Sequence, residues 1–228
     1  MATPLLDHTG WQITPTLHKS VNSTTDLAKI TLPLLFAVCV IGASGVIGAD
    51  IAYAHARVGA SSLVSACRDV TALDAVADVA RRVARNEGLP IHVAVYDIMS
   101  DSDVSLLSEV IRREIGQLDV LAIDAGLWGQ TAIRVTEGST QRCQVVIDID
   151  VIGAYLAAHH LLSILLASKD RTKAVVAIYR TGAWITDGPF AHAAFCVNKL
   201  AWGRLVEDTA NDIIEEGVLV VAVYPECV

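Results

Sequence analysis

The sequence predicts a single-domain α/β protein in which a doubly wound parallel sheet lies between two helical layers (α/β/α). Three observations lead to this prediction. Short apolar runs alternate with amphipathic segments, a glycine-rich turn follows the first apolar run, and 228 residues suit one well-filled core. Residues 1–30 are polar and contain Pro4 and Pro15, so we expect an irregular arm there, ahead of a domain at residues 31–228.

Several apolar runs have the length and composition of buried parallel strands. They occupy residues 34–41, 63–66, 91–96, 120–123, 174–178 and 218–223. Residues 30–49 carry no charge and are numerous enough to cross a bilayer. Pro33 and the glycines after it interrupt this stretch, so we interpret it as a strand, a turn and the start of a helix. We expect no membrane span.

Amphipathic segments between these runs predict helices that cover the sheet. Residues 71–88 have apolar positions at helical spacing, with Thr71 and Asp74 as a capping box and a terminal glycine. Residues 100–116 repeat this pattern. Residues 150–167 are apolar nearly all round, which predicts a helix that is central or packed against a second copy of the chain. We therefore expect a homodimer or a homotetramer.

Composition narrows the classes of partner. Hydrophobic residues make up 53% of the chain, charged residues 18%, and the mean hydropathy is +0.49. The net charge of −8 and the scattered basic residues argue against a nucleic-acid partner. The five cysteines are spread singly, without metal-ligand spacing, so we expect reduced thiols, no metal site and a cytoplasmic protein.

The stretch VIGASGVIG at residues 40–48 follows the first predicted strand and opens a helix. Glycines in such a turn let the backbone approach a pyrophosphate, while the helix N-terminus supplies amide donors. This context predicts a Rossmann-type nucleotide site. The second strand ends in SACRD, where Arg68 favours the 2′-phosphate of NADP and Asp69 would favour NAD. We expect NADP, with NAD possible; a solvated surface role for Arg68 is the alternative.

In their order and spacing, these motifs resemble the short-chain dehydrogenase/reductase family, especially its fungal members with a polar N-terminal extension. The resemblance covers residues 30–228. It is carried by IGASGVIG, by YDI at 96–98, DAG at 124–126, DVIG at 150–153, NK at 198–199 and YPE at 224–226. It implies a set of cofactor-binding residues: Gly42, Ser44, Gly45, Ile47, Gly48, Arg68, Asp97, Ile98, Ala125, Gly126, Lys199 and Pro225.

The catalytic residues of the family are an Asn, a Ser, a Tyr and a Lys, and the Tyr transfers the proton. The resemblance puts Asp150 at the Asn position, Arg180 or Thr181 in the Ser region and Phe195 at the Tyr position, and keeps only Lys199. A positioned general acid is worth about 10²- to 10⁴-fold in rate, so ordinary carbonyl reduction should be severely impaired. The resemblance also leads us to expect a domain at residues 31–228 that is short of the family's C-terminal substrate loop and last strand.

Three functions follow as hypotheses. The first is a divergent biosynthetic enzyme that isomerises or cyclises a hydrophobic small molecule without redox chemistry. It would use Asp150 as a base, Arg180 and His192 as partners, and Lys199 to hold bound NADP(H). The second is an NADPH-dependent carbonyl reductase whose proton donor is His192, Thr181 or a water. The third is a non-catalytic nucleotide-binding protein, in which an Asp150–Lys199 ion pair only fills space.

Overall fold

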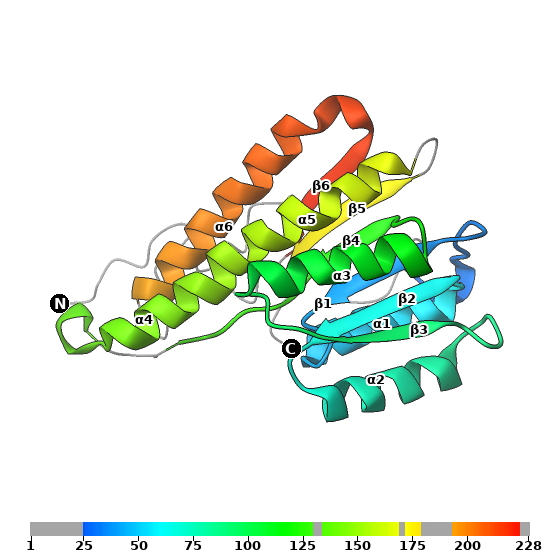
Figure 1. The fold of residues 1–228 in the computed structure, drawn as a ribbon, viewed down its shortest axis with the longest axis horizontal. Helices are drawn as coiled ribbons and strands as arrows, with labels where there is room; N and C mark the ends of the chain where they lie inside the picture. The colour runs from blue at the N-terminus through cyan, green and yellow to red at the C-terminus, as the bar shows by residue number, and fades with distance from the viewer. Residues whose placement is uncertain (1–24, 130–133, 169–171, 179–192, 224–228) are drawn as a thin grey trace.

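The computed structural model describes residues 25–129, 134–168, 172–178 and 193–223. Its sheet has six parallel strands in the order β3-β2-β1-β4-β5-β6 (Figure 1). The strands are β1 (Ala37–Ile41), β2 (Ser62–Cys67), β3 (Ile91–Val95), β4 (Val120–Ile123), β5 (Lys173–Ile178) and β6 (Val218–Val223). From β1 the chain adds β2 and β3 on one side of the sheet, and then β4, β5 and β6 on the other side. The predicted doubly wound sheet is therefore confirmed.

The first strand is shorter than predicted. It begins at Ala37, whereas the apolar run begins at Leu34. Leu35 has a φ of 60°, a left-handed value that breaks an extended strand, and Leu34 is 90% exposed. The other five strands agree with their predicted ranges to within one residue at each end. Residues 30–49 form the end of the arm, β1, a turn and the start of α1, as predicted.

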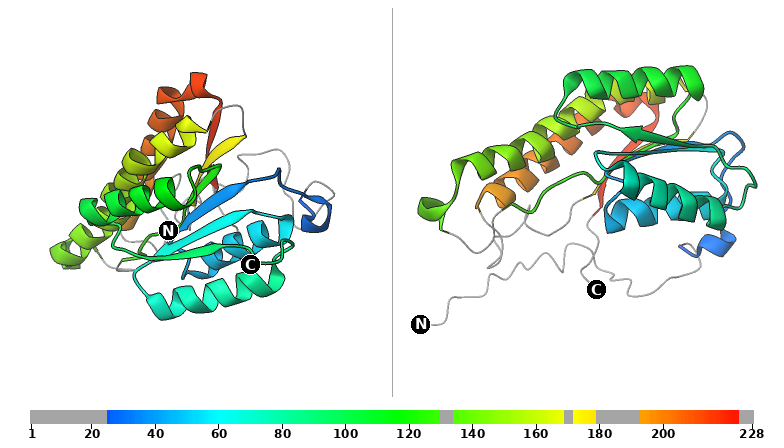
Figure 2. Two further views of the ribbon diagram at one scale, coloured as in Figure 1. Left: turned by 45° about the vertical axis from the view of Figure 1, so that its right-hand side comes forward. Right: turned by 60° about the horizontal axis from the view of Figure 1, so that its bottom comes forward.

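Helices cover both faces of the sheet, which confirms the three layers. On one face lie α1 (Val46–Val58) and α2 (Val70–Val83); on the other lie α3 (Asp101–Glu114), α5 (Ala154–Ala167) and α6 (Ala193–Asp212) (Figure 2). Alternate residues of β1 point to opposite cores, with Val38 and Val40 packed under α1 and α2. Cys39 and Ile41 belong to the core beneath α3, α5 and α6. Short 3-10 turns occur at Leu27–Lys29, Val135–Glu137 and Ile214–Glu216.

The N-cap predicted for α2 is wrong. Asp69, not Thr71, is the cap, and its carboxylate accepts a hydrogen bond from the amide of Ala72 at 3.1 Å. The helix therefore starts at Val70, and it ends at Val83, ahead of the predicted stop at Gly88. Asp69 takes this place because a carboxylate at the N-cap both bonds a free amide and opposes the positive end of the helix dipole.

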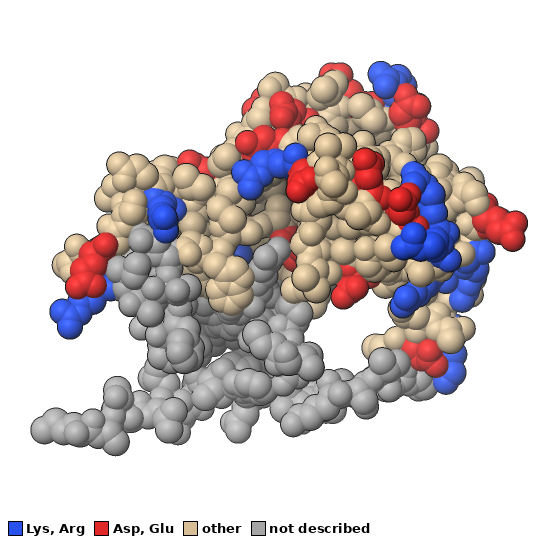
Figure 3. All heavy atoms as spheres, turned by 90° about the horizontal axis from the view of Figure 1, so that it is seen from below, with Lys and Arg blue, Asp and Glu red and all other residues tan. Residues whose placement is uncertain are grey.

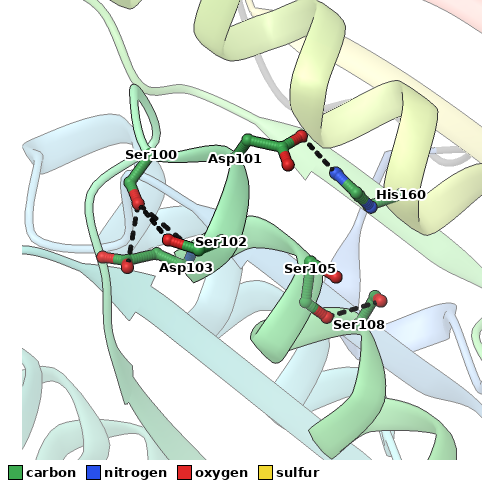
Figure 4. Close-up of polar contacts among 7 residues, drawn as sticks. All are labelled: Ser100, Asp101, Ser102, Asp103, Ser105, Ser108 and His160. Atoms are coloured by element: carbon green, nitrogen blue, oxygen red, sulfur yellow. Dashed lines mark hydrogen bonds and ion pairs between the residues drawn. The ribbon is translucent and has the colours of Figure 1, made fainter.

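Helix α3 begins as predicted. The hydroxyl of Ser100 accepts a hydrogen bond from the amide of Asp103 and donates one to its carboxylate (Figure 4). The pKa of Asp103 is lowered, chiefly by the bond from the amide of Asp97 and then by that from Ser100. Asp101 lies 2.8 Å from Nε2 of His160 and so connects α3 to α5 (Figure 4).

The predicted helix at 150–167 is part of a longer helical stretch. It runs from α4 (Thr140–Ile147) through a π-helical segment, Asp148–Gly153, into α5. The stretch Thr140–Ala167 is long and apolar enough to cross a membrane. An 18-residue window within it has a mean hydropathy of 1.6, yet half of this window is buried inside the protein. Its buried residues pack against the sheet, as in a central helix, while Tyr155 is exposed.

Candidate functional site

Two positions in the turn after β1 accept only glycine. Gly42 has a φ of 86°, and a Cβ on it would lie 2.5 Å from the amide nitrogen of Ala125. A Cβ on Gly48 would lie 2.4 Å from the carbonyl oxygen of Gly42. Real Cβ atoms do not approach backbone this closely, so the turn, the first helix and the loop after β4 are packed in direct backbone contact.

The N-terminus of α1 has amide groups available for an anion. Gly45 is the N-cap and supplies no side-chain cap. The amides of Val46 and Ile47 have no hydrogen-bond partner among the described residues. The amide of Gly48 donates to Oδ2 of the buried Asp124 at 2.9 Å. Two unpaired amides at the positive end of a helix are the usual donors to a phosphate group.

A cavity of about 300 Å³ lies over this turn and the tips of β2, β3 and β4. It brings together seven of the predicted cofactor residues: Gly42, Ser44, Gly45, Arg68, Ile98, Ala125 and Gly126. Asp69, considered with Arg68 at the tip of β2, lines the cavity too, and sequence reasoning missed four more lining residues: Cys67, Tyr96, Leu127 and Ile149. The first two adjoin predicted residues at strand ends and could have been found from that position. Leu127 and Ile149 give no signal in the sequence.

Other predicted cofactor residues do not line this cavity. Ile47 and Gly48 lie in the first turn of α1 beside it. Asp97 accepts a hydrogen bond from the amide of Met99 at 3.0 Å, which shapes the loop after β3. Pro225 lies outside the described residues.

Arg68 and Asp69 have different surroundings at the tip of β2. Both side chains reach the cavity wall. The carboxylate of Asp69 already caps α2, whereas the guanidinium of the exposed Arg68 has no partner among the described residues. The residue that would bind a ribose diol is thus engaged in the fold, and the residue that would bind a phosphate is available.

Tyr96 forms a neutral part of the cavity wall. Its hydroxyl is buried and has no hydrogen-bond partner among the described residues. Burial, and secondarily the neighbouring Cys39, Cys67 and Asp97, raises the pKa of Tyr96 well above its ordinary value. Burial also raises the pKa of Cys39 to about 12. Neither group ionises near neutral pH, so this side of the cavity suits an uncharged ring.

Asp150 and Lys199 form a buried ion pair next to the cavity. Asp150 lies in the π-helical segment, and its Oδ2 is 2.9 Å from Nζ of Lys199 on α6. The other oxygen, Oδ1, accepts a hydrogen bond from the amide of Leu127 at 2.9 Å. A Cβ on Gly126 would lie 3.0 Å from Asp150 Oδ1 and 3.5 Å from Lys199 Nζ, so the pair lies directly behind Gly126. Neither charged side chain lines the cavity itself.

The local structure around this pair is specialised. A π-type segment inserts an extra residue into a helix and is frequent at functional sites. Here it turns Asp150 toward α6 and away from solvent. Lys199 is stabilised further by the ring of Trp202, whose centroid lies 4.4 Å from Nζ. This is the ion pair that the sequence left open as the alternative to a free carboxylate base.

Phe195, which the sequence predicts at the family's Tyr position, is packed into the core. Its ring stacks on Trp128 with centroids 5.2 Å apart and planes 5° apart. Trp128, from the loop after β4, is 44% exposed and is a site residue that the sequence analysis missed. Lys199 Nζ lies 5.4 Å from the Phe195 centroid. The lysine thus faces aromatic rings where the family has a phenol.

Three further predicted site residues, Arg180, Thr181 and His192, lie outside the described residues, and their roles stay predictions. Among the residues that the structure does describe, no cluster of three or more His, Cys, Asp or Glu side chains can hold a metal ion. Cys39, Cys67 and Cys143 are free thiols in the described part of the chain.

Comparison with known proteins agrees with this geometry. The family model for short chain dehydrogenases matches residues 37–228. The short chain dehydrogenase pgmD of Aspergillus terreus is 28% identical over 240 residues, which covers 99% of this chain and 76% of the relative. This fungal relative confirms the predicted resemblance.

Two solved structures share the fold. A metagenomic short-chain oxidoreductase in complex with NADP superposes with a TM-score of 0.74 at 22% identity, over 87% of this chain and 84% of that one. NAD+-bound xylitol dehydrogenase superposes with a TM-score of 0.75 at 22% identity, over 84% of this chain and 70% of that one. The chain belongs to the short chain dehydrogenase family.

Proposed function

We propose that this chain is a biosynthetic enzyme that binds NADP(H) and isomerises or cyclises a hydrophobic small molecule without net redox chemistry. One observation carries the proposal. A buried carboxylate–ammonium pair, Asp150 and Lys199, lies directly behind Gly126 at the nucleotide cavity, while a phenyl ring occupies the position of the family's proton donor.

The cavity walls support a dinucleotide. The amides of Val46 and Ile47 would bind the pyrophosphate, and Gly42 allows its close approach. Arg68 would bind the 2′-phosphate of NADP. The fold neighbours bind NADP in one case and NAD+ in the other, so the choice of NADP rests on Arg68. When bound, the nicotinamide supplies a hydride donor or acceptor, or acts only to order the site.

The residues at 150 and 199 support proton transfer better than carbonyl reduction. A phenyl ring at 195 cannot donate a proton to an alkoxide. A carboxylate can remove a proton from a carbon next to a carbonyl, and an adjacent ammonium stabilises the resulting enolate oxygen. Return of that proton from Asp150 to a different carbon completes an isomerisation, with atoms and electrons balanced and no cofactor consumed. Arg180 and His192 are the further groups that we expect to act on the anion.

A non-catalytic, nucleotide-binding protein is the second candidate. The observation that favours it is the engagement of both Asp150 oxygens, one by Lys199 and one by the amide of Leu127. A base that is already paired must lose this partner before it can act. Carbonyl reduction with His192, Thr181 or a water as the donor is the third candidate.

A homodimer or homotetramer built on α5 and α6 belongs to the same proposal. Its support is the set of exposed apolar residues on the π-helical segment, α5 and α6: Ile152, Tyr155, Val197 and Leu200. We place the protein in the cytoplasm because Cys39, Cys67 and Cys143 are free thiols. Lys and Arg are interspersed with Asp and Glu on the face shown in Figure 3, which supports a small-molecule substrate over nucleic acid.

The experiment follows two signals in one sample. The protein is incubated in deuterium oxide with NADPH and a set of hydrophobic ketones, while NMR follows deuterium incorporation and absorbance follows NADPH. Incorporation at constant NADPH, lost in Asp150→Asn but not in Arg113→Gln on α3, would support the proposal. Stoichiometric NADPH oxidation would show a reductase instead. Neither signal, in a folded protein that binds NADPH by calorimetry, would show the non-catalytic candidate.

A further inference from the structure

A second cavity adjoins the nucleotide cavity, and nothing above assigns it a ligand. Its volume is about 340 Å³, and it lies between the loop after β4 and helix α4. Its lining residues are Leu127, Gly129, Gln141, Arg142, Val145 and Val146. We call it the α4 hollow. Cavities of about 300–1,000 Å³ with apolar walls and few polar groups are typical small-molecule sites.

The hollow has a defined apolar floor. Gly129 has a φ of 68°, and a Cβ on it would lie 2.9 Å from Cγ2 of Val146, so the loop rests directly on α4. Val146 is buried beneath this contact, and Val145 stands at the rim with 43% exposure. The floor is therefore a built feature of the fold, held by a left-handed backbone conformation that favours glycine.

One cation stands at this apolar site. Arg142 is exposed, and its guanidinium forms no ion pair or hydrogen bond with any described residue. The nearby carboxylate of Asp148 accepts a hydrogen bond from Gln144 at 2.7 Å. An unpaired guanidinium beside an apolar surface recognises a planar oxyanion through two parallel hydrogen bonds. Charge and surface together point to an apolar anion.

The hollow is also close to the proposed reaction centre. Leu127 lines both cavities, and its amide holds Asp150. Arg142 and Val146 also contact the narrow space around the Trp128–Phe195 stack. A molecule in the hollow would therefore share Leu127 with the nucleotide cavity and border the Trp128–Phe195 stack, whose Phe195 ring lies 5.4 Å from Lys199 Nζ.

We propose that the α4 hollow binds the substrate, and that this substrate is a flat apolar molecule with a carboxylate or an equally acidic enol. The apolar body lies on Val145 and Val146, and the oxyanion pairs with Arg142. The assignment of this anion as the substrate rests on the function proposed above. The existence of the anion site does not, because it follows from the lining residues alone.

Calorimetry with 2-naphthoate tests the site, with neutral 2-naphthamide as the matched ligand. We expect wild-type protein to bind naphthoate more tightly than naphthamide. Arg142→Gln should weaken the binding of naphthoate about tenfold, because a charge-assisted hydrogen bond is lost, and should leave the binding of naphthamide unchanged. Arg113→Gln, at a surface ion pair on α3, is the control and should change neither. Val145→Glu, at an exposed position, should abolish naphthoate binding by adding a like charge.

Equal binding of the two ligands by wild type, or unchanged naphthoate binding in both Arg142→Gln and Val145→Glu, would overturn the proposal. So would competition by NADP, which would place naphthoate in the nucleotide cavity. NADP titration of the same samples separates the two proposals. If NADP does not bind, but Arg142→Gln still weakens the binding of naphthoate, the proposed function fails and the anion site stands.

Discussion

Nζ of Lys199 lies 2.9 Å from Oδ2 of Asp150, and neither side chain is more than 1% exposed. Removing one member of a buried ion pair leaves an uncompensated charge and costs roughly 3–5 kcal/mol. We expect Lys199→Met to lower the free energy of unfolding by about that amount in urea titrations. The exposed pair of Arg204 and Glu207, at 2.6 Å, provides the control. Arg204→Gln should cost less than about 1 kcal/mol, and equal losses would contradict a buried pair.

Gly42 should be essential for nucleotide binding. Gly42→Ala incurs the strain of a left-handed residue, ~1–2 kcal/mol, and also overlap with the backbone of Ala125, typically ~1–3 kcal/mol. Gly217 has a similar φ of 68° with nothing within 4 Å, so Gly217→Ala incurs only the strain. Calorimetry should find NADP binding lost in the first variant and kept in the second. Comparable binding in both would show that the close approach at Gly42 is not needed.

Arg68 should select NADP over NAD. Its guanidinium has no partner in the part of the chain that the structure describes, whereas Asp69 is held as the cap of α2. Arg68→Gln should weaken the binding of NADP about 10- to 100-fold, because a hydrogen bond to a charged group is lost. The affinity for NAD should change little. Titration of one protein preparation with both nucleotides provides the comparison. A parallel loss for both nucleotides would mean that Arg68 supports the fold and does not read the phosphate.

Asp124 should weaken nucleotide binding. Its carboxylate accepts a hydrogen bond from the amide of Gly48 in the first turn of α1. The carboxylate therefore places a negative charge behind the proposed phosphate site. Asp124→Asn keeps the side-chain shape and removes the charge. A charge near a helix end is worth about 0.3–1 kcal/mol, so NADP affinity should rise about two- to fivefold. The measurement is the dissociation constant at low and high salt, and a fall in affinity at low salt would refute the argument.

His55 should make the fold sensitive to acid. Burial lowers the pKa of His55 below 6.5, and the hydrogen bond from its Nδ1 to the carbonyl of Ile51 opposes this only in part. The unfolded chain then binds more protons than the folded chain near pH 6, so stability is retained above 6.5 and lost as the pH falls. His55→Gln should lose less thermal stability than wild type between about pH 7.5 and 5.5. An unchanged slope would assign the loss to other groups.

Local patterns were enough to predict the sheet and the turn. Apolar runs without charge specify buried parallel strands, and the glycines at 42 and 48 specify close backbone contact, because each effect depends on residues next to one another in the chain. Where nearby residues carry the same local signal, the sequence did not show which of them the fold uses. Asp69 and Thr71 can both cap a helix, and Leu34 is as apolar as the residues of β1 that follow it.

The sequence by itself determined the family fold and the glycine turn after the first strand, and it predicts that Phe195 replaces the family's proton donor. Only the tertiary structure decided that Asp150 pairs with Lys199 and that Trp128 covers Phe195, since these partners come from separate elements. It also decided that Arg142 lies beside an apolar hollow with no ion-pair partner among the described residues. The physical reason is that burial and pairing of a charge depend on every element packed around it, whereas strand and turn formation depend mainly on adjacent residues.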